Sequence, residues 1–550
     1  MRITLELSPT TGPVTWVIRT HPNGVEAESE AGRVALQGDH AHRAVSSNRE
    51  LGITGSNTPR SVDGSTRLRV ALQDSGVTIT TDRLGTVLLY LRPDHGRLRA
   101  SSSLGELGRH CGATLDEDAA WELMLLGQPL GDRTLLKGVR LMPAATHLRW
   151  EASGNVTETR YWQASPNRET RETPAHQRDV DELIQRLGQA HERAGLDRAR
   201  LAVPVTGGLD SRINLALLGG RTADARLFTV HSPGDPEVGI ARRIARRLRV
   251  ELEEIPFTPA SWWALLDGEP WSGEIHRHQF WLSPVGSHLA TTAPPPVLLD
   301  GYLQDALFNP RIVTASAENA LHRRVLGYAA YRAQALPHPR MREVLAGLWE
   351  RTDAHYSSLG QPGLEANQRF YLENRSRRFV FDSVRLAQLQ APVALPGIDH
   401  ELMDFAMALP WNLRHGGPLY REAIQRLSPA LAAVPYDKTG LPVSSRRTLS
   451  TSRRVRKVAT RALNRLWPGR PFLRAAEPPL AIGMRRSPEF RAAVADRLDG
   501  SRWLAHLFET ENIGTRLAHQ EIPEGRTLPI LLGAITTANL ERFTTESHRS

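Results

Sequence analysis

The chain has a single cysteine, Cys111, among its 550 residues. One thiol cannot form an internal disulfide, and it cannot supply a metal site built from several cysteines. The surrounding residues, Gly-Arg-His-Cys-Gly-Ala, lack the pattern of a catalytic cysteine. We therefore expect neither disulfide bonds nor thiol chemistry.

Lysine is almost as scarce, because the chain has only Lys137, Lys438 and Lys457 although its formal net charge is +10. Nearly all of the basic residues are arginine, and this bias makes net charge weak evidence for nucleic-acid binding. The densest basic stretch, Arg446 to Arg474, is typical of a solvated helix face; the alternative is a surface for an acidic peptide or nucleic-acid phosphates. No RNA-binding module is recognisable, so we expect no nucleic-acid partner.

Long apolar runs are also missing. No run of 18 apolar residues is present, so we expect no segment that spans a membrane. The first residues alternate like a β-strand and lack the apolar core of a signal peptide, which predicts a cytoplasmic protein. The length exceeds what one hydrophobic core supports, and we expect two or three domains.

Composition and periodicity predict two domains joined by a linker. Residues 1–165 contain short alternating runs that predict strands at 67–72, 77–81 and 86–91, followed by a helix at 116–126. Residues 166–177 are polar and contain proline, as is typical of a linker. Residues 178–550 form the second predicted domain.

The second domain begins with helices that alternate with apolar strands. The predicted elements are 178–194, 201–205, 211–218, 225–231 and 237–249. This alternation predicts an α/β fold with a parallel sheet covered by helices on both faces, and a mostly helical remainder follows. Ligands of such sheets bind beyond the carboxyl ends of the strands.

A glycine turn lies at one of these strand ends. The residues Thr206-Gly-Gly-Leu-Asp-Ser follow the apolar run that ends at Val205. Gly207 and Gly208 allow backbone dihedrals closed to other residues and a close approach of amides to an anion, and the next helix adds the positive end of its dipole. No Gly-Lys-Ser/Thr follows, so the turn resembles the pyrophosphate loop of AMP-forming ligases rather than a Walker loop. The alternative is an ordinary strand-to-helix turn.

The end of the next predicted strand carries candidate partners for this turn. Val230, His231 and Ser232 end the next predicted strand, where backbone groups could bind an adenine edge. Asp235 and Glu237 follow, either as helix caps or as part of the site.

Carboxylates predict a metal site beside the turn. Asp210 is a poor phosphate ligand, so it indicates bound Mg²⁺ or an indirect role. After the apolar run at 297–299, a second turn carries Asp300 and Asp305. Asp210 and Asp305 on separate loops could hold one Mg²⁺ with pyrophosphate oxygens and water.

Lys438 lies in the loop Val434-Pro-Tyr-Asp-Lys-Thr-Gly-Leu-Pro. A compact ammonium there could neutralise charge that develops on a phosphate or on a tetrahedral oxyanion. The alternative is an ordinary surface lysine.

Several ordered motifs resemble the asparagine synthetase family, and within it the branch of β-lactam synthetases and lasso-peptide cyclases. Besides the glycine turn, Gly301-Tyr-Leu-Gln-Asp resembles the Gly-Tyr-Gly-Ala-Asp loop of β-lactam synthetases. The family order continues through Ala394-Leu-Pro-Gly-Ile-Asp, Leu419-Tyr-Arg-Glu-Ala and Pro435-Tyr-Asp-Lys. In the first domain, Thr81-Asp-Arg-Leu-Gly-Thr and Gly131-Asp-Arg-Thr-Leu-Leu resemble glutaminase-domain segments.

The resemblance implies a fold for each part. The first domain would be an αββα class II glutamine amidotransferase-like (Ntn) domain, and the second an adenine nucleotide α-hydrolase-like (HUP) synthetase domain. An active glutaminase of the family needs cysteine directly after the initiator methionine, whereas this chain has Arg2. We therefore expect the first domain not to hydrolyse glutamine.

The resemblance also implies roles for individual residues. ATP and pyrophosphate would be held by the turn, the next strand end and the second loop: Val205, Thr206, Gly207, Gly208, Leu209, Asp210, Ser211, Val230, His231, Ser232 and Gly301. Asp210 and Asp305 would hold Mg²⁺, and Lys438 would stabilise the acyl transition state. Tyr302 matches the tyrosine that β-lactam synthetases pair with a glutamate to deprotonate the amine, and Glu373 is the candidate for that glutamate.

Three departures from the family pattern bear on this transfer. Thr206 replaces serine and keeps the hydroxyl. Arg212 replaces a small hydroxyl residue and is expected to rearrange the pyrophosphate contact, either by clamping the anion or by blocking it. Leu303 and Gln304 replace small residues and are expected to crowd the second loop.

Together these features predict an ATP-dependent amide synthetase that releases AMP and pyrophosphate without using glutamine. A lasso-peptide macrocyclase is the favoured interpretation, with a peptide substrate and, in addition, a leader-peptide-binding protein and a protease as partners. The alternatives are an asparagine synthetase or β-lactam synthetase-like enzyme that acts on a small molecule, an RNA-modifying ligase, and a non-catalytic scaffold that binds nucleotide or peptide.

Overall fold

The computed structural model describes residues 2–7, 17–21, 24–29, 32–37, 44–45, 50–54, 66–112, 114–169, 177–196, 199–232, 235–259, 262–263, 266, 283–292, 294–310, 313–318, 320–336, 338–388, 391–444, 479–519 and 527–545. The basic stretch from Arg446 to Arg474 and most of the predicted linker at 166–177 lie outside the described residues. The predicted boundary between two domains stays a prediction.

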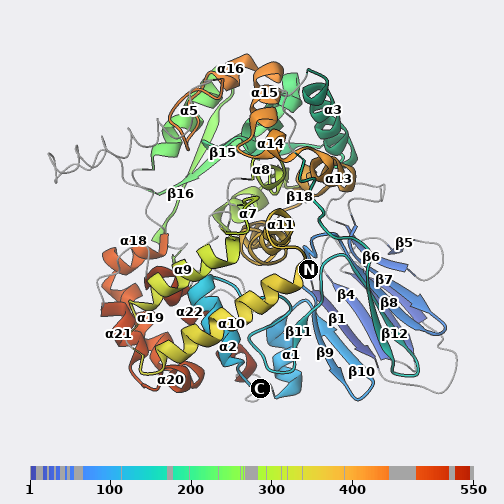
Figure 1. Cartoon of the computed structure of the whole chain (residues 1–550), viewed down its shortest axis with the longest axis vertical. Helices are drawn as coiled ribbons and strands as arrows, with labels where there is room; N and C mark the ends of the chain where they lie inside the picture. Colours follow the sequence, from blue (N-terminus) through green and yellow to red (C-terminus); the bar gives the residue numbers. More distant parts are fainter. Residues whose placement is uncertain are drawn as a thin grey trace.

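Two antiparallel sheets form the amino-terminal part (Figure 1). The first contains β1 (Arg2–Leu7), β2 (Val17–His21), β3 (Gly24–Ser29), β4 (Gly32–Gln37), β9 (Tyr90–Asp94), β10 (Arg97–Ser101) and β11 (Arg140–Leu141), in the order β11-β9-β10-β1-β4-β3-β2. The second contains β5 (Ala44–Val45), β6 (Glu50–Thr54), β7 (Thr66–Gln73), β8 (Gly76–Thr81), β12 (Thr146–Glu151) and β13 (Val156–Arg160), in the order β13-β12-β8-β7-β6-β5. Val70 and Ile79 of the second sheet share one buried core with Leu91 and Leu98 of the first, so the two sheets pack face to face.

The predicted strands at 67–72 and 77–81 are confirmed by β7 and β8. The strand predicted at 86–91 is wrong in its first half, because regular strand begins only at Tyr90. Asp82 explains the difference: its carboxylate accepts the N–H groups of Leu84 and Thr86, at 2.8 and 2.9 Å. These bonds hold residues 82–86 in a turn instead of a strand.

A five-stranded parallel sheet forms the middle of the chain, as the alternating pattern predicts. Its strands are β14 (Leu201–Pro204), β15 (Arg226–His231), β16 (Leu252–Pro256), β17 (Val297–Leu299) and β18 (Val393–Ala394), in the order β16-β15-β14-β17-β18. Alternate residues enter different cores: Val203 and Leu299 lie in one, Ala202 and Leu298 in the other. The sheet is therefore buried on both faces.

Helices cover both faces of this sheet. Helix α5 (Pro236–Leu248) and α16 (Pro429–Ala432) contribute to one core, and α7 (Ser283–Ala290) and α12 (Asp382–Gln388) to the other. The remaining helical segments of this part are α3 (Gln177–Arg193), α4 (Asp210–Leu218), η1 (Gly219–Asp224), α8 (Gln304–Phe308), η4 (Pro396–Ile398), α13 (His400–Ala408), α14 (Trp411–Arg414) and α15 (Pro418–Leu427).

A third region is helical and joins distant parts of the sequence. It contains α1 (Leu104–Cys111), α2 (Glu117–Leu126), α9 (Leu321–Ala333), α10 (Met341–Ser358), α11 (Leu364–Phe370), the π-helical segment η3 (Tyr371–Val380), α18 (Pro479–Arg486), α19 (Pro488–Asp499), α20 (Arg502–Phe508), α21 (Ile513–His519) and α22 (Thr527–Thr545). Helix α2 confirms the helix predicted at 116–126, with Asp116 as its N-cap. The carboxyl-terminal helix α22 packs against α1 and α2 (Figure 1), and the Arg109 guanidinium donates to the Phe543 carbonyl at 2.9 Å. One core thus combines residues from before and after the predicted linker.

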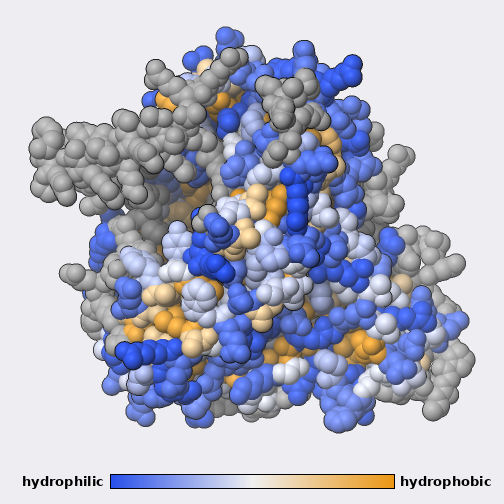
Figure 2. All heavy atoms as spheres, viewed as in Figure 1, coloured by the Kyte–Doolittle hydropathy of each residue, from blue (hydrophilic) through white to orange (hydrophobic). Residues whose placement is uncertain are grey.

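The face viewed in Figure 2 is largely hydrophilic, with small apolar patches between polar residues. Among the described residues, the large hydrophobic side chains that are exposed are Val156, Tyr161, Trp263, Tyr328, Tyr331 and Trp349. None of the described helices is both long and apolar enough to cross a membrane.

Candidate active site

The glycine turn lies at the carboxyl end of the parallel sheet, between β14 and α4. The Val205 N–H donates to the Phe228 carbonyl at 2.7 Å, which places the turn beside the end of β15. Val230, His231 and Ser232 follow at that strand end. The predicted nucleotide-binding segments therefore lie on neighbouring parallel strands, at the edge where such sheets bind ligands.

The two glycines are needed for close approach and not for unusual dihedrals. Neither Gly207 nor Gly208 has a positive φ angle, so the expectation of special dihedrals is wrong. A Cβ added to Gly207 would lie 2.5 Å from the Asp437 Cβ, and one added to Gly208 would lie 3.2 Å from the Thr206 hydroxyl oxygen. That hydroxyl also accepts the Gly208 N–H at 3.2 Å. The turn is thus packed tightly against the loop that carries Lys438.

The second loop also contacts the turn closely. A Cβ on Gly301 would lie 2.4 Å from the Asp210 Cβ, so glycine is required where the two loops meet. Asp300 closes this loop by accepting the Tyr302 N–H at 2.8 Å, and burial raises the pKa of Asp300 to about 6. Asp305 lies in the first turn of α8 and is exposed.

Asp210 and Asp305 lie close enough to repel each other. Burial raises the pKa of Asp210 well above its usual range, and the charge of Asp305 raises it further. Two carboxylates that disfavour each other's ionisation are typical of a cation site, and their hard oxygen atoms suit Mg²⁺. The described residues contain no group of three or more His, Cys, Asp or Glu side chains that could hold a metal alone. The pair therefore fits a Mg²⁺ that takes its other ligands from phosphate and water.

Lys438 belongs to the same cluster of charges. Its ammonium lies 2.6 Å from a carboxylate oxygen of Asp437, and the Asp437 N–H donates to the Gly207 carbonyl at 3.1 Å. Burial alone would lower the pKa of Lys438, but the charges of Asp437, Glu237 and Asp305 raise it above its usual value. The lysine is therefore a cation that pairs with Asp437, beside the glycine turn, and its charge is stabilised by Glu237 and Asp305.

Arg212 neither clamps nor blocks the space in front of the turn. Its guanidinium is fully buried behind the turn, where burial lowers the pKa of Arg212 to about 10. It donates to five backbone carbonyls: Gly208 at 3.0 Å, Gly207 at 3.2 Å, Leu431 at 3.1 Å, Val434 at 2.6 Å and Pro435 at 2.5 Å. Arginine at this position therefore ties the glycine turn to the segment that leads to Lys438.

The crowding expected from Leu303 and Gln304 does not fill the site. Leu303 is buried and adopts a left-handed backbone, with φ of 74°, a conformation that costs most residues about 1 kcal/mol. Gln304 is completely buried, and its amide donates to Asn214 at 3.0 Å. Both side chains thus lie in the interior beneath the loop.

Tyr302 and Glu373 are not brought together. The Tyr302 hydroxyl is buried and bonds to the carbonyl and the hydroxyl of Ser376, at 3.1 and 2.8 Å, and burial raises the pKa of Tyr302. Glu373 instead pairs with Arg160 of β13. The proposed tyrosine–glutamate base therefore has no support from these contacts, and it stays a prediction.

Tyr420 and Tyr371 had no assigned role in the sequence interpretation, whereas Glu237 was left open there as either a helix cap or part of the site. The Tyr420 hydroxyl lies 3.0 Å from Asp210, and Glu237 accepts the Gly207 N–H at 3.5 Å while its neighbour Asp235 caps α5. Burial, together with the charges of Asp305 and Asp210, raises the pKa of Tyr371 to about 12. Tyr420 lies within the motif Leu419-Tyr-Arg-Glu-Ala. This motif contributed to the family resemblance, but it did not indicate what Tyr420 does.

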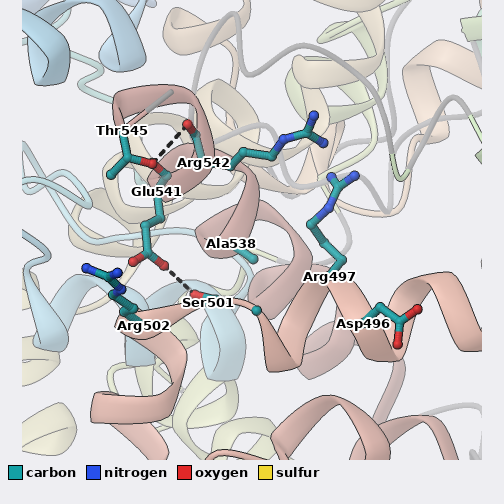
Figure 3. A pocket seen from close by; sticks show the side chains of 9 residues that line it. Asp496, Arg497, Ser501, Arg502, Ala538, Glu541, Arg542 and Thr545 are labelled. Carbon is teal, nitrogen blue, oxygen red and sulfur yellow. Dashed lines mark hydrogen bonds between the residues drawn. The ribbon is translucent and has the colours of Figure 1, made fainter. Parts of the chain in front are cut away.

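A separate cavity of about 480 Å³ lies among the carboxyl-terminal helices (Figure 3). It is lined by Asp496, Arg497, Gly500, Ser501, Arg502, Ala538, Glu541, Arg542 and Thr545. None of these residues belongs to the glycine turn or to the two loops that meet it, so this cavity is not part of the candidate active site.

Comparison with known proteins identifies the family. No curated protein matches the chain. The family model described as asparagine synthase matches residues 182–478, which is more than half of the sequence and includes the glycine turn, Asp305 and Lys438. The chain therefore belongs to the asparagine synthase family and is a carbon–nitrogen ligase of that type, using ATP and giving AMP and pyrophosphate.

Proposed function

We propose that this enzyme joins a carboxylate and an amine of its own substrate without hydrolysing glutamine, and that the substrate is a peptide which it closes into an isopeptide macrocycle. The observation that carries the proposal is the cluster of Asp210, Asp305 and Lys438 around the glycine turn, in a chain whose one cysteine is Cys111. The charges of this cluster suit adenylation of a carboxylate. The one thiol of the chain, Cys111, lies at the end of helix α1 and not at the position where glutaminases of the family carry their catalytic cysteine.

The first step activates the substrate carboxylate. A carboxylate oxygen attacks the α-phosphorus of ATP, the bond from that phosphorus to the α–β bridging oxygen breaks, and pyrophosphate leaves with the electron pair. The amides at the start of α4 and the Lys438 ammonium would offset the charge on the departing phosphates. Asp210 and Asp305 would hold Mg²⁺, which supplies further charge neutralisation at the phosphates.

The second step forms the amide. The substrate amine attacks the carbonyl carbon of the acyl-adenylate, the carbon–oxygen bond to AMP breaks, and the amine loses one proton to a base or to solvent. Lys438 would stabilise the oxyanion of this step, and the neighbouring carboxylates that raise its pKa support this role by keeping it charged.

The amino-terminal part supports the same interpretation. Its two face-to-face sheets have the helices α1 and α2 packed beside them, in keeping with the proposed Ntn-like domain. Without a cysteine at its first strand, we propose that it acts as a structural partner of the synthetase part. A leader-peptide-binding protein and a separate protease would supply the processed substrate.

The proposal is tested by supplying alternative nucleophiles and measuring AMP and pyrophosphate. A peptide with a free amino terminus and an acidic side chain should stimulate release of both products and lose the mass of one water. Glutamine should not stimulate release, and Lys438→Met should abolish it. Release that depends on aspartate with ammonia, or on a small amino acid with an internal amine, would overturn the peptide assignment, and release that depends on glutamine would overturn the absence of glutaminase activity.

A further inference from the structure

A chain of buried polar side chains runs from helix α3 to Asp210. The Nε2 atom of His191 lies 3.1 Å from Asn214 Oδ1, and Gln304 donates to the same oxygen at 3.0 Å. The Tyr420 hydroxyl then lies 2.9 Å from Gln304 Oε1 and 3.0 Å from Asp210 Oδ1. Four helices, α3, α4, α8 and α15, each contribute to this chain of contacts.

We infer that Tyr420 is a positioning residue that fixes the Asp210 carboxylate for binding Mg²⁺ and pyrophosphate. The inference rests on the proposed function, because it takes Asp210 as a metal ligand. Tyr420 and Gln304 lie in the interior, with exposures of 0%, so neither is placed to contact a substrate. Their effect on the site must pass through Asp210.

The arrangement determines one orientation for each member of the chain. Gln304 donates its NH₂ group to Asn214 Oδ1, so its oxygen faces Tyr420, and the single Tyr420 proton lies between two acceptors, Gln304 Oε1 and Asp210 Oδ1. A hydroxyl with one proton donates to the carboxylate whenever Asp210 is ionised, as it is when it ligates a cation. One carboxylate oxygen of Asp210 is therefore committed to Tyr420, and this sets the direction of the other.

The local backbone is arranged to place Gln304 in this chain. Residues 300–304 reverse direction through Leu303, whose left-handed φ of 74° turns the chain into α8. Gly397 makes room for this turn, because a Cβ there would lie 2.2 Å from the Tyr302 carbonyl oxygen. The strained turn therefore places Gln304 in the interior, whereas the next residue, Asp305, is exposed on the other side of the loop.

The conservative variant Tyr420→Phe tests the inference by removing one hydroxyl. Binding of ATP is measured by calorimetry across a Mg²⁺ titration and again with EDTA. Loss of an outer partner of a metal ligand typically costs about 10- to 100-fold in metal affinity. We therefore expect Tyr420→Phe to raise the half-saturating Mg²⁺ concentration at least about tenfold, with metal-free ATP binding unchanged. Excess Mg²⁺ should restore the rate of pyrophosphate release.

Tyr356→Phe is the matched control, because that buried hydroxyl bonds to Asn367 and Gly363 within the helical region.

Three outcomes would contradict the inference. A Tyr420→Phe enzyme with wild-type Mg²⁺ dependence overturns it and leaves the proposed function intact. Equal weakening of ATP binding with Mg²⁺ and with EDTA shows a merely structural role and also overturns it. A wild-type enzyme whose ATP binding and turnover do not depend on a divalent cation overturns the proposed metal site itself, and the two failures are thereby distinguished.

Discussion

Replacing Arg212 by lysine should separate the glycine turn from the Lys438 loop while keeping the buried charge. The guanidinium donates to five carbonyls, and an ammonium has only three N–H donors. At least two carbonyls therefore lose their partner. A buried acceptor without a partner costs about 1–3 kcal/mol, so Arg212→Lys should lower the free energy of unfolding by about 2–6 kcal/mol. Relaxation of the turn and entry of water favour the lower half of that range.

The assay has two parts, urea unfolding followed by tryptophan fluorescence and pyrophosphate release at a temperature where the variant stays folded. A misplacement of about 1 Å in a catalytic group can cost about 100-fold in rate, so we expect a comparable loss of kcat/KM.

Arg369→Lys is the control, since Arg369 is also buried and donates to the carbonyls of Ala164 and Leu359 but does not touch the turn. It should lose stability without losing activity in the folded enzyme. The reasoning is refuted if Arg212→Lys unfolds at the wild-type urea concentration, or if the folded variant releases pyrophosphate at the wild-type rate.

Three further predictions concern the carboxylates, the buried histidine and the second loop. Asp210→Asn should abolish most pyrophosphate release, a loss on the order of 100-fold, yet stabilise the metal-free protein. Because the pKa of Asp210 is raised in the folded state, this carboxyl ionises at a lower pH in the unfolded chain than in the folded protein. The destabilisation of the fold by Asp210 therefore grows as pH rises above the normal carboxyl range. The gain in melting temperature of Asp210→Asn should accordingly be larger at pH 8 than at pH 4. A gain that does not change with pH would contradict this account. Burial lowers the pKa of His191 from 6.5 to about 4, so between these values the unfolded state binds more protons. Its contribution of about 3 kcal/mol is present above pH 6.5 and lost as pH falls to 4, and His191→Gln should flatten that part of the stability profile measured by urea unfolding. Gly301→Ala should push the second loop away from Asp210 and reduce pyrophosphate release at least about tenfold. Gly327→Ala on the exposed face of α9, where an added Cβ meets nothing within 4 Å, should keep full activity and gain up to about 1 kcal/mol; equal activity of the two variants would argue against the close approach.

The sheet and its edge were predictable because their signals are local. Alternation of apolar strands with helices is a property of residues a few positions apart, and it indicated β14, β15 and the turn between β14 and α4. The same local reasoning failed at 86–91, where one carboxylate, Asp82, organises the next four residues into a turn. A hydrogen bond from a side chain can override a favourable strand pattern, and no periodicity reports it.

The partners of the site residues were less predictable, because they depend on contacts between distant positions. From its neighbours in sequence alone, Arg212 was expected to clamp or to block pyrophosphate. Its carbonyl partners at 431–435 lie more than 200 residues away, and only the packing of α16 beside the sheet brings them within reach. Tyr420 is likewise separated from Asp210 by 210 residues.

These contacts explain how the glycine turn at the carboxyl end of the sheet keeps its shape. Apolar packing alone places a backbone loosely at a surface, since hydrophobic burial is non-directional. Here the directional constraints come from behind: Arg212 holds the carbonyl side of the turn, and Tyr420 holds one oxygen of Asp210. The enzyme can therefore place a strongly charged site at the edge of its sheet with its positioning groups removed from water, where their hydrogen bonds are strongest.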